Sequence, residues 1–447
     1  MVTLADLQVR TLGPCTVPSP LAQYVGTRAT NEYYVGEEDR ILFDDTIELI
    51  RRRGLPLEEL PSFETGGPRA DLFFDPQDVR VGVVTCGGLC PGLNDVIRAL
   101  VLELHEHYGV DDVWGFRNGY AGLVPDSGLE PVRLTPEFVA NIHERGGTVL
   151  GSSRGAQDVE VVVDTLQARG IDVLIVIGGD GSMRGAHRIA EEALRRDAGI
   201  AVVGVPKTID NDIPHIGQSF GFQTAYSRAA QSIKAAKIEA EASINGIGMV
   251  KVMGRHAGFI ACYSALAGHD ADFVLIPEVP FALDGDDGLL AHVRRKVETQ
   301  GHAVLVLAEG AGQEHLPETE STDASGNARL ADIGRLLRER ITTEFEERGE
   351  DVLFRYFDPG YFIRSVPAEP ADSVYCSRLA QTAVHAAMAG RTDMVVGRRR
   401  HRFVHVPIPY VTHRTHHVSP DGDLWLSVLE STAQPFQMGA QGYAGRS

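Results

Sequence analysis

The chain has 447 residues, of which 43% are hydrophobic and 23% charged, which is ordinary for a globular protein of two or three domains. Its 61 acidic and 42 basic residues leave a formal net charge of −19, which argues against a nucleic-acid or anionic-membrane partner. Because we find neither a membrane-length apolar run nor a signal-peptide pattern, we expect a cytoplasmic protein.

The first strong strand signal comes after residue 78. Residues 1–78 mix proline, charge and short apolar patterns, and we interpret them as an N-terminal extension packed on the main body. The run VRVGVVTCGG at 79–88 is β-branched and ends in glycines, and apolar residues at helical spacing follow it over 93–104. This pattern predicts a strand, a tight glycine turn and a helix.

The same strand–turn–helix pattern recurs along the chain. Apolar runs that end in glycine or polar residues occur within 171–182, 199–212, 250–267 and 302–312. Continuous apolar strands that alternate with helices indicate parallel sheets covered on both faces. Ligands of such sheets bind outside the carboxyl ends of the strands, which is where the polar residues of this chain gather.

Four further segments complete the pattern. Residues 223–242 are rich in helix formers and predict a helix that begins a second domain, whereas 314–332 predicts a mobile polar loop. A helix with one apolar face is predicted over 333–345. Five histidines fall within 401–417, and we interpret this part of the tail as a solvated surface segment rather than a metal site.

The glycine turn TCGGLCPG at 85–92 lies between a predicted strand and a predicted helix. Its backbone N–H groups, together with the helix N-terminus, can bind a phosphate, although the turn matches no standard nucleotide fingerprint. Glycines in such a turn are as often steric as functional. The two cysteines of the turn, Cys86 and Cys90, indicate reduced thiols more than a metal site.

The motif GGDGS at 178–182 is a stronger signal. It places the carboxylate of Asp180 among residues without bulky side chains, so phosphate and a metal ion can approach the backbone. Mg²⁺ usually takes one or two carboxylates together with phosphate oxygens. A simple Asp-Gly turn remains the alternative for this motif taken alone.

The stretch VPKTIDND at 205–212 ends a predicted buried strand with two carboxylates. We expect Asp210 and Asp212 to point into the same crevice, one accepting a proton from a hydroxyl and the other holding Mg²⁺ through water. Thr208 can hydrogen-bond a phosphoryl oxygen, and Lys207 can neutralise charge. A capped turn before a helix would explain one acidic residue but not the whole string.

Arginines stand beside glycine in three loops, within 151–155, 253–258 and 355–365. The guanidinium fork suits phosphate, so several such loops predict a polyanionic ligand.

Taken in order, these motifs resemble the phosphofructokinase family over about 79–400. The matching motifs are GGLCPGLN, GSSRG, GGDGS, PKTIDND, MGRHAG, LAEG and DPGYFIR. The chain is most similar to the branch with plant and trypanosomatid ATP-dependent enzymes, which also carry N-terminal extensions and the lysine form of PKTIDND.

The resemblance implies two Rossmann-like three-layer α/β domains with parallel-rich sheets and the active site in the cleft between them. A large nucleotide-binding domain would comprise 79–222 and 363–400, and a sugar-phosphate domain 223–362, with 1–78 as an N-terminal extension and 401–447 as a C-terminal tail. The implied reaction is glycolytic transfer of phosphate from ATP, with Mg²⁺, to the 1-hydroxyl of fructose 6-phosphate.

The resemblance also assigns roles to residues. Asp210 would be the general base, Arg255 would stabilise the transferring phosphoryl group, and Thr208 and Lys207 would assist. The nucleotide would contact Gly88, Arg154, Gly155, Asp180, Gly181, Ser182 and Gly185. The sugar phosphate would contact Thr208, Asp210, Met253, Gly254, Arg255, Glu309, Arg355, Tyr361 and Arg364. Asp180 and Asp212 would hold Mg²⁺.

The resemblance further implies more than one subunit. Arg355 would reach the site of a neighbouring subunit, so a homodimer or homotetramer is expected, with interfaces on which allosteric control can act.

Three departures from the family pattern bear on this reading. Lys207 is shared with pyrophosphate-dependent members, but those members usually carry an aspartate where this chain has Gly181, so we expect ATP and keep a pyrophosphate-dependent phosphotransferase as the alternative. Gly246 stands where familiar bacterial enzymes have a substrate arginine, and Tyr361 replaces a histidine.

Two other classes of protein fit the sequence less well. An NAD or diacylglycerol kinase shares the GGDG turn but not PKTIDND or MGR. A silent regulatory subunit is disfavoured because Asp180, Asp210, Asp212 and Arg255 are all present.

Overall fold

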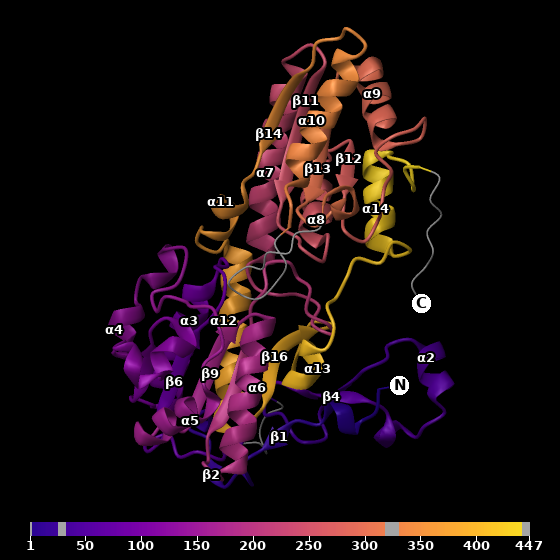
Figure 1. Cartoon of the computed structure of the whole chain (residues 1–447). Coiled ribbons are helices and arrows are strands. Elements are labelled where there is room, and N and C mark those ends of the chain that lie inside the picture. The colour runs from indigo at the N-terminus through magenta and orange to yellow at the C-terminus, as the bar shows by residue number, and fades with distance from the viewer. Residues whose placement is uncertain (1, 26–32, 318–329, 440–447) are drawn as a thin grey trace. The chain divides into compact units, whose positions relative to one another are not determined.

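The structure is a computed structural model that describes residues 2–25, 33–317 and 330–439 (Figure 1). The chain divides into two compact units. Unit 1 comprises Met1–Ile209, Ile213–Gly221 and Ser365–Arg414, and unit 2 comprises Asp210–Asp212, Phe222–Arg364 and Thr415–Ser447. None of the helices in the described ranges is long and apolar enough to cross a lipid bilayer.

Unit 1 is built on one large mixed sheet. Among the described residues its strand order is β3-β4-β17-β16-β10-β9-β6-β7-β8. The strands are β3 (Arg40–Leu42), β4 (Ser62–Thr65), β17 (Arg402–Pro407), β16 (Met394–Arg399), β10 (Ala201–Pro206), β9 (Val173–Gly178), β6 (Val81–Thr85), β7 (Val113–Phe116) and β8 (Val132–Arg133). The five strands from β16 to β7 are parallel, and the outer ones pair antiparallel.

Helices cover both faces of this sheet. Ile175 and Ile177 of β9 pack in one apolar cluster with α3 (Leu93–Leu102) and α12 (Pro370–Met388). The alternating residues Leu174 and Val176 pack in a second cluster with α5 (Val159–Ala168) and α6 (Asp180–Arg195). Because successive side chains of a strand point to opposite faces, a strand buried on both sides reads as one continuous apolar run.

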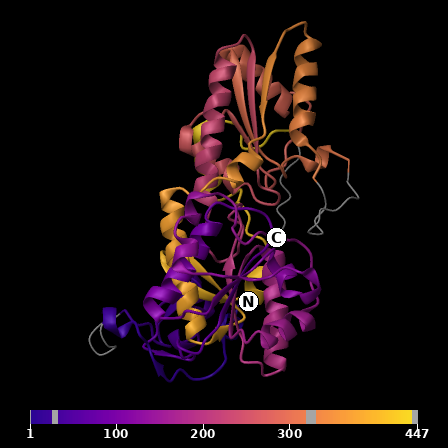
Figure 2. The same cartoon turned by 90° about the vertical axis from the view of Figure 1, so that its left-hand side faces the viewer.

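Unit 2 contains a smaller parallel sheet of order β12-β13-β11-β14. Its strands are β12 (Phe273–Leu275), β13 (His302–Ala308), β11 (Gly246–Val252) and β14 (Leu353–Phe357). Helices α9 (Leu289–Gln300) and α10 (Ile333–Glu346) share an apolar cluster with β11 and β13. Outside that cluster, α7 (Phe222–Glu241) contacts β11 and β13, and α8 (Phe259–Gly268) contacts β13 and β12. Figure 2 shows the helices of each unit layered against its sheet.

The remaining elements are short or peripheral. Apart from short 3-10 and π turns, they are β1 (Arg10–Thr11), β2 (Val17–Pro18), α1 (Ala22–Val25), α2 (Ile47–Arg53), β5 (Asp71–Leu72), α4 (Pro136–Val139), α11 (Gly360–Arg364), β15 (Arg391–Thr392), α13 (Ile408–Thr412) and α14 (Asp423–Thr432).

The predicted α/β class with parallel-rich sheets is confirmed, as are the strands predicted within 171–182, 199–212 and 302–312 and the helix predicted over 333–345. The polar loop predicted at 314–332 falls mostly outside the described residues.

The N-terminal segment packs on unit 1, and the C-terminal segment is divided between the two units. Strands β3 and β4 of the N-terminal segment extend the large sheet beyond β17, which itself lies in the segment predicted as a tail. Residues 401–414 therefore belong to unit 1, and residues from Thr415 onward belong to unit 2.

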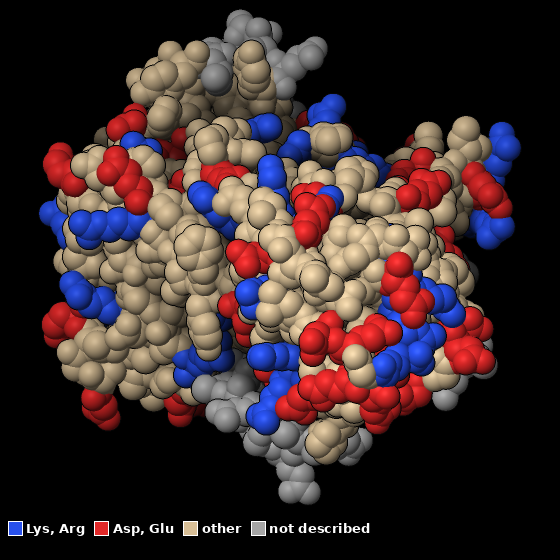
Figure 3. Space-filling model, turned by 90° about the horizontal axis from the view of Figure 1, so that it is seen from above, with Lys and Arg blue, Asp and Glu red and all other residues tan. Residues whose placement is uncertain are grey.

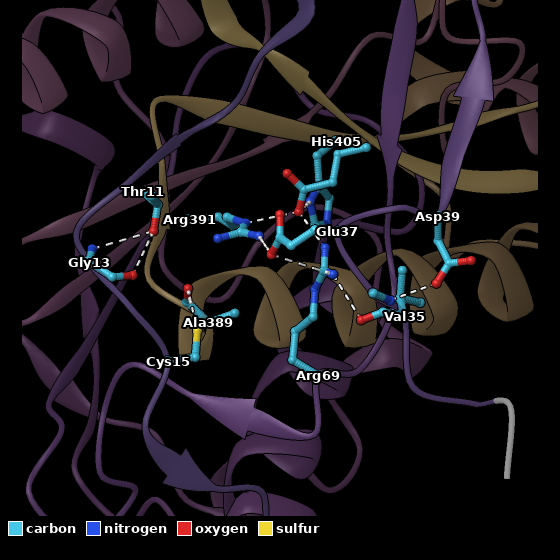
Figure 4. Close-up of polar contacts among 12 residues, drawn as sticks. Thr11, Gly13, Cys15, Val35, Glu37, Asp39, Arg69, Ala389, Arg391 and His405 are labelled. Carbon is cyan, nitrogen blue, oxygen red and sulfur yellow. Dashed lines mark hydrogen bonds and ion pairs between the residues drawn. The ribbon is translucent and has the colours of Figure 1, made fainter. Parts of the chain in front are cut away.

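A buried charged cluster holds the N-terminal segment in place (Figure 4). The carboxylate of Glu64 on β4 accepts hydrogen bonds from Arg69 and, at 2.8 Å, from Nε of Arg391 on β15. Glu37 accepts a further bond of 2.6 Å from Arg391. His405, only 1% exposed, lies with Nδ1 3.3 Å from Glu64. The prediction that the histidine-rich segment is a solvated surface segment was therefore wrong for His405, because this residue lies on a strand inside the sheet.

Candidate active site

The glycine turn after β6 is joined to the GSSRG loop by two hydrogen bonds of Gly87. The N–H group of Gly87 donates to the Ser153 carbonyl at 3.2 Å, and the Gly87 carbonyl accepts from the Ser152 hydroxyl at 2.5 Å. A Cβ atom on Gly88 would lie 3.6 Å from Nη2 of Arg154. The structure thus brings together Gly88 and Arg154, two residues that the sequence predicted to share a nucleotide site.

Asp180 is the first residue of α6, so its carboxylate lies where the helix dipole favours negative charge. The side chain is 57% exposed and pairs with Arg184 one turn later. Within the same turn, the Ser182 N–H group donates to the Gly179 carbonyl at 2.9 Å. This end of α6 therefore presents both a carboxylate and a helix N-terminus, the arrangement expected for a magnesium-bound phosphate.

Gly181 and Gly185 differ in what surrounds them. A Cβ atom on Gly181 would meet only Nη2 of Arg184, at 3.9 Å, so a side chain has room there. A Cβ atom on Gly185 would lie 2.7 Å from the ring of Tyr120, so this glycine is required for packing. The Tyr120 hydroxyl donates to the Ser182 carbonyl at 2.6 Å and supports the first turn of α6, a contribution that no sequence pattern suggested.

Lys207 follows β10 and is only 6% exposed. Its backbone N–H group donates to the Gly178 carbonyl at 2.8 Å, so it is fixed beside the GGDGS turn. A Cβ atom on Gly87 would lie 3.7 Å from Nζ of Lys207 and 3.9 Å from Oγ of Ser182. The ammonium group therefore lies at the glycine turn, where it can neutralise a bound phosphate. Gly155, also predicted here, has open space around its Cβ direction.

Cys86, in the same turn, is a buried thiol. Burial raises the pKa of Cys86 to about 11, so the group is protonated at neutral pH. Cys90 donates its S–H to the Phe220 carbonyl at 3.2 Å. Neither cysteine forms a disulfide, which agrees with the interpretation as reduced thiols.

The PKTIDND string is shared by the two units. Thr208 belongs to unit 1, where its carbonyl accepts a hydrogen bond of 2.6 Å from the Ser219 hydroxyl. Asp210–Asp212 belong to unit 2. Between the two aspartates, Asn211 has φ of 58°, a left-handed conformation that asparagine tolerates better than most residues.

Within unit 2, Asp210 lies among other charged groups of the predicted site. Burial raises its pKa well above the ordinary value of 3.8, and the negative charges of Asp212 and Glu309 raise it further. A backbone hydrogen bond from Arg255 and the charge of its guanidinium act in the opposite direction. A carboxylate with a raised pKa in a polar site is a suitable general base near neutral pH.

The loops that carry Arg255 and Glu309 are locked to each other. The Glu309 N–H group donates to the Val252 carbonyl at 2.9 Å, and the Gly310 N–H group donates to the Gly254 carbonyl at 3.0 Å. A Cβ atom on Gly310 would overlap the carbonyl of Arg255, and one on Gly254, whose φ is 133°, would lie 2.6 Å from the Ala257 carbonyl oxygen. Glycine is therefore required at both positions for this close approach.

The other predicted sugar-phosphate residues are more exposed. Tyr361 is 78% exposed, and the guanidinium of Arg364 lies 4.5 Å from its ring centre. A Cβ atom on Gly360 would lie 3.9 Å from Cγ of Met253, so the DPGYFIR segment begins beside the methionine. Arg355, on β14, forms an ion pair of 3.2 Å with Glu239 of α7.

Gly246 departs from the bacterial pattern for a steric reason. It is the first residue of β11, and a Cβ atom there would overlap the Ala240 carbonyl at the end of α7. The backbone conformation of this chain has no room for an arginine at this position.

Sequence reasoning missed Lys251. Its ammonium group lies 3.0 Å from the carboxylate of Asp358 and 3.1 Å from that of Asp332, and the Tyr356 hydroxyl also donates to Asp332 at 3.2 Å. Burial favours the neutral amine, but these bonds outweigh it and raise the pKa of Lys251. A lysine within the apolar strand GIGMVKV, just before Met253, was the available signal.

No cluster of three or more potential metal-ligating side chains occurs within the described ranges. This is compatible with Mg²⁺, which commonly relies on one or two carboxylates and takes its other ligands from phosphate and water. Asp180 in unit 1 and Asp212 in unit 2 are carboxylates of the required type.

Charge is mixed on the face of the molecule that Figure 3 shows. On the face in Figure 3, acidic and basic side chains of the described residues are interspersed, and the basic ones form no continuous stripe. This distribution does not resemble the basic face of a nucleic-acid-binding protein.

Comparisons with known proteins agree with the motif order. The family model described as phosphofructokinase matches residues 80–387. An ATP-dependent 6-phosphofructokinase of Amycolatopsis methanolica is 56% identical over 444 residues, which cover 98% of this chain and 96% of that protein. A protein of the same name from Borreliella burgdorferi is 42% identical, over 97% of this chain and 98% of its own length.

Solved structures share the fold. A pyrophosphate-dependent phosphofructokinase from Marinobacter aquaeolei aligns with a TM-score of 0.65 at 20% identity, over 82% of this chain and 94% of that one. Phosphofructokinase from Pichia pastoris aligns with a TM-score of 0.60 at 22% identity, over 79% of this chain and 37% of that longer chain.

Proposed function

This chain belongs to the phosphofructokinase family, and we propose that it transfers the γ-phosphoryl group of ATP to the 1-hydroxyl of fructose 6-phosphate. The products are fructose 1,6-bisphosphate and ADP, and the reaction is a step of glycolysis. The observation that carries the proposal is the 56% identity to an ATP-dependent 6-phosphofructokinase over nearly the whole of both chains.

Unit 1 would bind the nucleotide. The backbone amides of the glycine turn, the guanidinium of Arg154 and the buried ammonium of Lys207 supply donors and positive charge for the phosphates. Asp180 and Asp212 would hold Mg²⁺, which supplies charge neutralisation for the phosphoryl oxygens when it is bound. The exposed N-terminus of α6 supports this role, because it leaves space at Gly181 for the triphosphate.

Unit 2 would bind the sugar phosphate and carry out the proton transfer. Asp210 would accept the proton of the 1-hydroxyl, and Thr208 would hydrogen-bond the phosphoryl oxygens. Arg255 would stabilise the charge that develops on the transferring group. Met253, Gly254, Glu309, Tyr361 and Arg364 would contact the sugar phosphate.

The functional unit would be a homodimer or homotetramer in the cytoplasm. The 43% exposure of the Arg355 side chain supports its proposed reach to a neighbouring subunit, since the residue is accessible from outside its own chain. The five cysteines all lie in the described residues and none forms a disulfide, as is usual for proteins of reducing compartments.

The deciding experiment compares phosphoryl donors. Purified protein with Mg²⁺ and fructose 6-phosphate should form fructose 1,6-bisphosphate with ATP and not with pyrophosphate. Product with pyrophosphate alone would overturn the proposed donor while leaving the base and sugar in place. Absence of product with either donor would overturn the proposed reaction.

A further inference from the structure

The histidine-rich segment ends in a short stretch, residues 415–418, that we name the C-terminal strap. The strap begins the last segment of unit 2, Thr415–Ser447. Asp210–Asp212, Arg255 and His256 belong to the same unit. The proposed chemistry assigns no role to the strap, but its contacts are to the two loops that carry the proposed base and the proposed phosphoryl-stabilising arginine.

The strap contacts each of these loops through one hydrogen bond. The His416 N–H group donates to the Asp212 carbonyl at 2.7 Å. The His417 ring lies with Nδ1 2.7 Å from the His256 carbonyl, which can only accept, so Nδ1 carries the proton. The His416 ring also packs on Phe259, with 5.0 Å between ring centres.

Glu278 joins the far end of the strap to the arginine loop. Its Oε1 accepts from the Val418 N–H group at 2.8 Å, and its two oxygens accept from the Gly258 N–H group at 3.0 and 3.1 Å. Gly258 ends the MGRHAG motif, so a single carboxylate anchors both the strap and the loop that carries Arg255.

The loop with Asp210 needs such support for a topological reason. Asp210–Asp212 are only three residues of unit 2, and the chain belongs to unit 1 on both sides of them, at Ile209 and Ile213. Their position within unit 2 therefore depends on their own contacts. Those contacts include the bond from the Arg255 backbone to Asp210 and the bond from the strap to Asp212.

We propose that the C-terminal strap fixes the loop of Asp210 against the loop of Arg255, so that the base is aligned with the attacking hydroxyl while the arginine is aligned with the phosphoryl group that this hydroxyl receives. His417 and Glu278 are positioning residues in this arrangement, not catalytic ones. The inference rests on the proposed roles of Asp210 and Arg255. Because misplacing a reacting group by about 1 Å can cost about 100-fold in rate, loss of one support should affect turnover before it affects binding.

Two matched pairs of variants test the strap. His417→Ala removes the donor to His256, whereas His417→Asn places an amide N–H group near the position of Nδ1. Glu278→Met removes the acceptor for Val418 and Gly258, whereas Glu278→Gln retains a carbonyl oxygen. His413→Ala is the control, because this exposed histidine belongs to the same segment and lies outside the strap.

Steady-state kinetics and amide hydrogen exchange are measured together on the full chain. We expect kcat to fall about ten-fold in His417→Ala and Glu278→Met, with the KM values of both substrates within about two-fold of wild type. Exchange of the 208–212 and 255–258 amides should rise in the same two variants. His417→Asn, Glu278→Gln and the control should stay close to wild type.

The proposal is overturned if folded His417→Ala keeps its turnover, if KM rises as much as kcat falls, or if exchange increases without loss of turnover. His417→Ala carries the test alone if Glu278→Met does not fold, because His417 is exposed. If the wild-type protein forms no product, the proposed reaction fails, and unchanged exchange in the variants would then separately overturn the strap.

Discussion

Replacing Asp210 with asparagine should lower activity and raise stability at the same time. The substitution keeps the size of the side chain and removes both the proton acceptor and the charge. A positioned general base commonly contributes about 10²- to 10⁴-fold to the rate, so kcat should fall by that factor. ATP binding should remain close to wild type, because the residues proposed to contact the nucleotide lie in unit 1.

The expected gain in stability follows from the raised pKa of Asp210. Burial and the charges of Asp212 and Glu309 disfavour the carboxylate in the folded state, so ionised Asp210 destabilises the fold at neutral pH. Each unit of pKa elevation costs about 1.4 kcal/mol, which corresponds to about 3–6 °C in Tm for a cooperative unit of about 150–250 residues.

Because the pKa of Asp210 is raised in the folded state, the destabilisation depends on pH. Below the ordinary value of 3.8 the group is protonated in both states and there is no penalty. The penalty grows as pH rises toward the folded pKa, and then stays constant. Asp210→Asn should therefore melt above wild type at pH 7 and at the same temperature near pH 3.

The assay combines coupled turnover with thermal melting in the absence of Mg²⁺ and substrates. Asp421→Asn is the matched control, because it makes the same charge change at an exposed position. If the turnover of Asp210→Asn is within about ten-fold of wild type in the same assay, Asp210 is not the general base. A lower Tm at pH 7 would refute the electrostatic argument.

Three further substitutions test other parts of the structure. Gly181→Asp should fold normally and lose about 100-fold in turnover with ATP, because its carboxylate would repel the phosphates; full activity with ATP would contradict this. Lys251→Met should raise the KM for fructose 6-phosphate several-fold with the KM for ATP unchanged, since Asp358 loses its ion pair; an effect on ATP alone would count against it. Arg391→Met should destabilise the fold by about 3 kcal/mol, measured by urea unfolding, and an unchanged midpoint would show that Glu64 does not need this arginine.

The Arg391→Met protein should also respond differently to acid. Burial alone would raise the pKa of Glu64, but the hydrogen bond from His405 and the charges of Arg391 and Arg69 outweigh it and hold that pKa well below 4.5. Burial also lowers the pKa of His405, so its ring is neutral at pH 7 and the two arginines supply the balancing charge. The stability from Glu64 is thus present above pH 4.5 and is lost as pH falls below it, and Arg391→Met should weaken this loss.

The interior of the fold was predictable because its strands are buried on both faces. A strand such as β9 has no polar side to interrupt its pattern, and the polar residues then mark its carboxyl end. The outer strands gave no such signal. Thr65 of β4 pairs with Val404 of β17, far along the chain, and both strands carry buried polar residues such as Glu64 and His405. A charge that is paired only after folding reads as surface in a local pattern.

In the candidate site, too, local features were predictable from the sequence and contacts between distant segments were not. The motifs predicted which loops matter, since glycine beside charge at a strand end is a local signal. They did not separate glycines that leave space from those that permit close packing. Gly181 and Gly185 stand in one helix, yet only the second touches another side chain at packing distance, that of Tyr120. That difference depends on a neighbour from another part of the chain.

The choice between ATP and pyrophosphate as phosphoryl donor also depends on whether a glycine leaves open space. Lys207 is held by the Gly178 carbonyl beside the glycine turn, and an ammonium group there would neutralise the phosphates of ATP and of pyrophosphate equally. A charge that serves both donors cannot select between them. Selection requires a feature that excludes one donor, and an aspartate at position 181 would exclude the bulkier ATP by its size and charge. Because Gly181 leaves that space open, Lys207 is compatible with ATP, and we propose Gly181 as the residue that selects the donor.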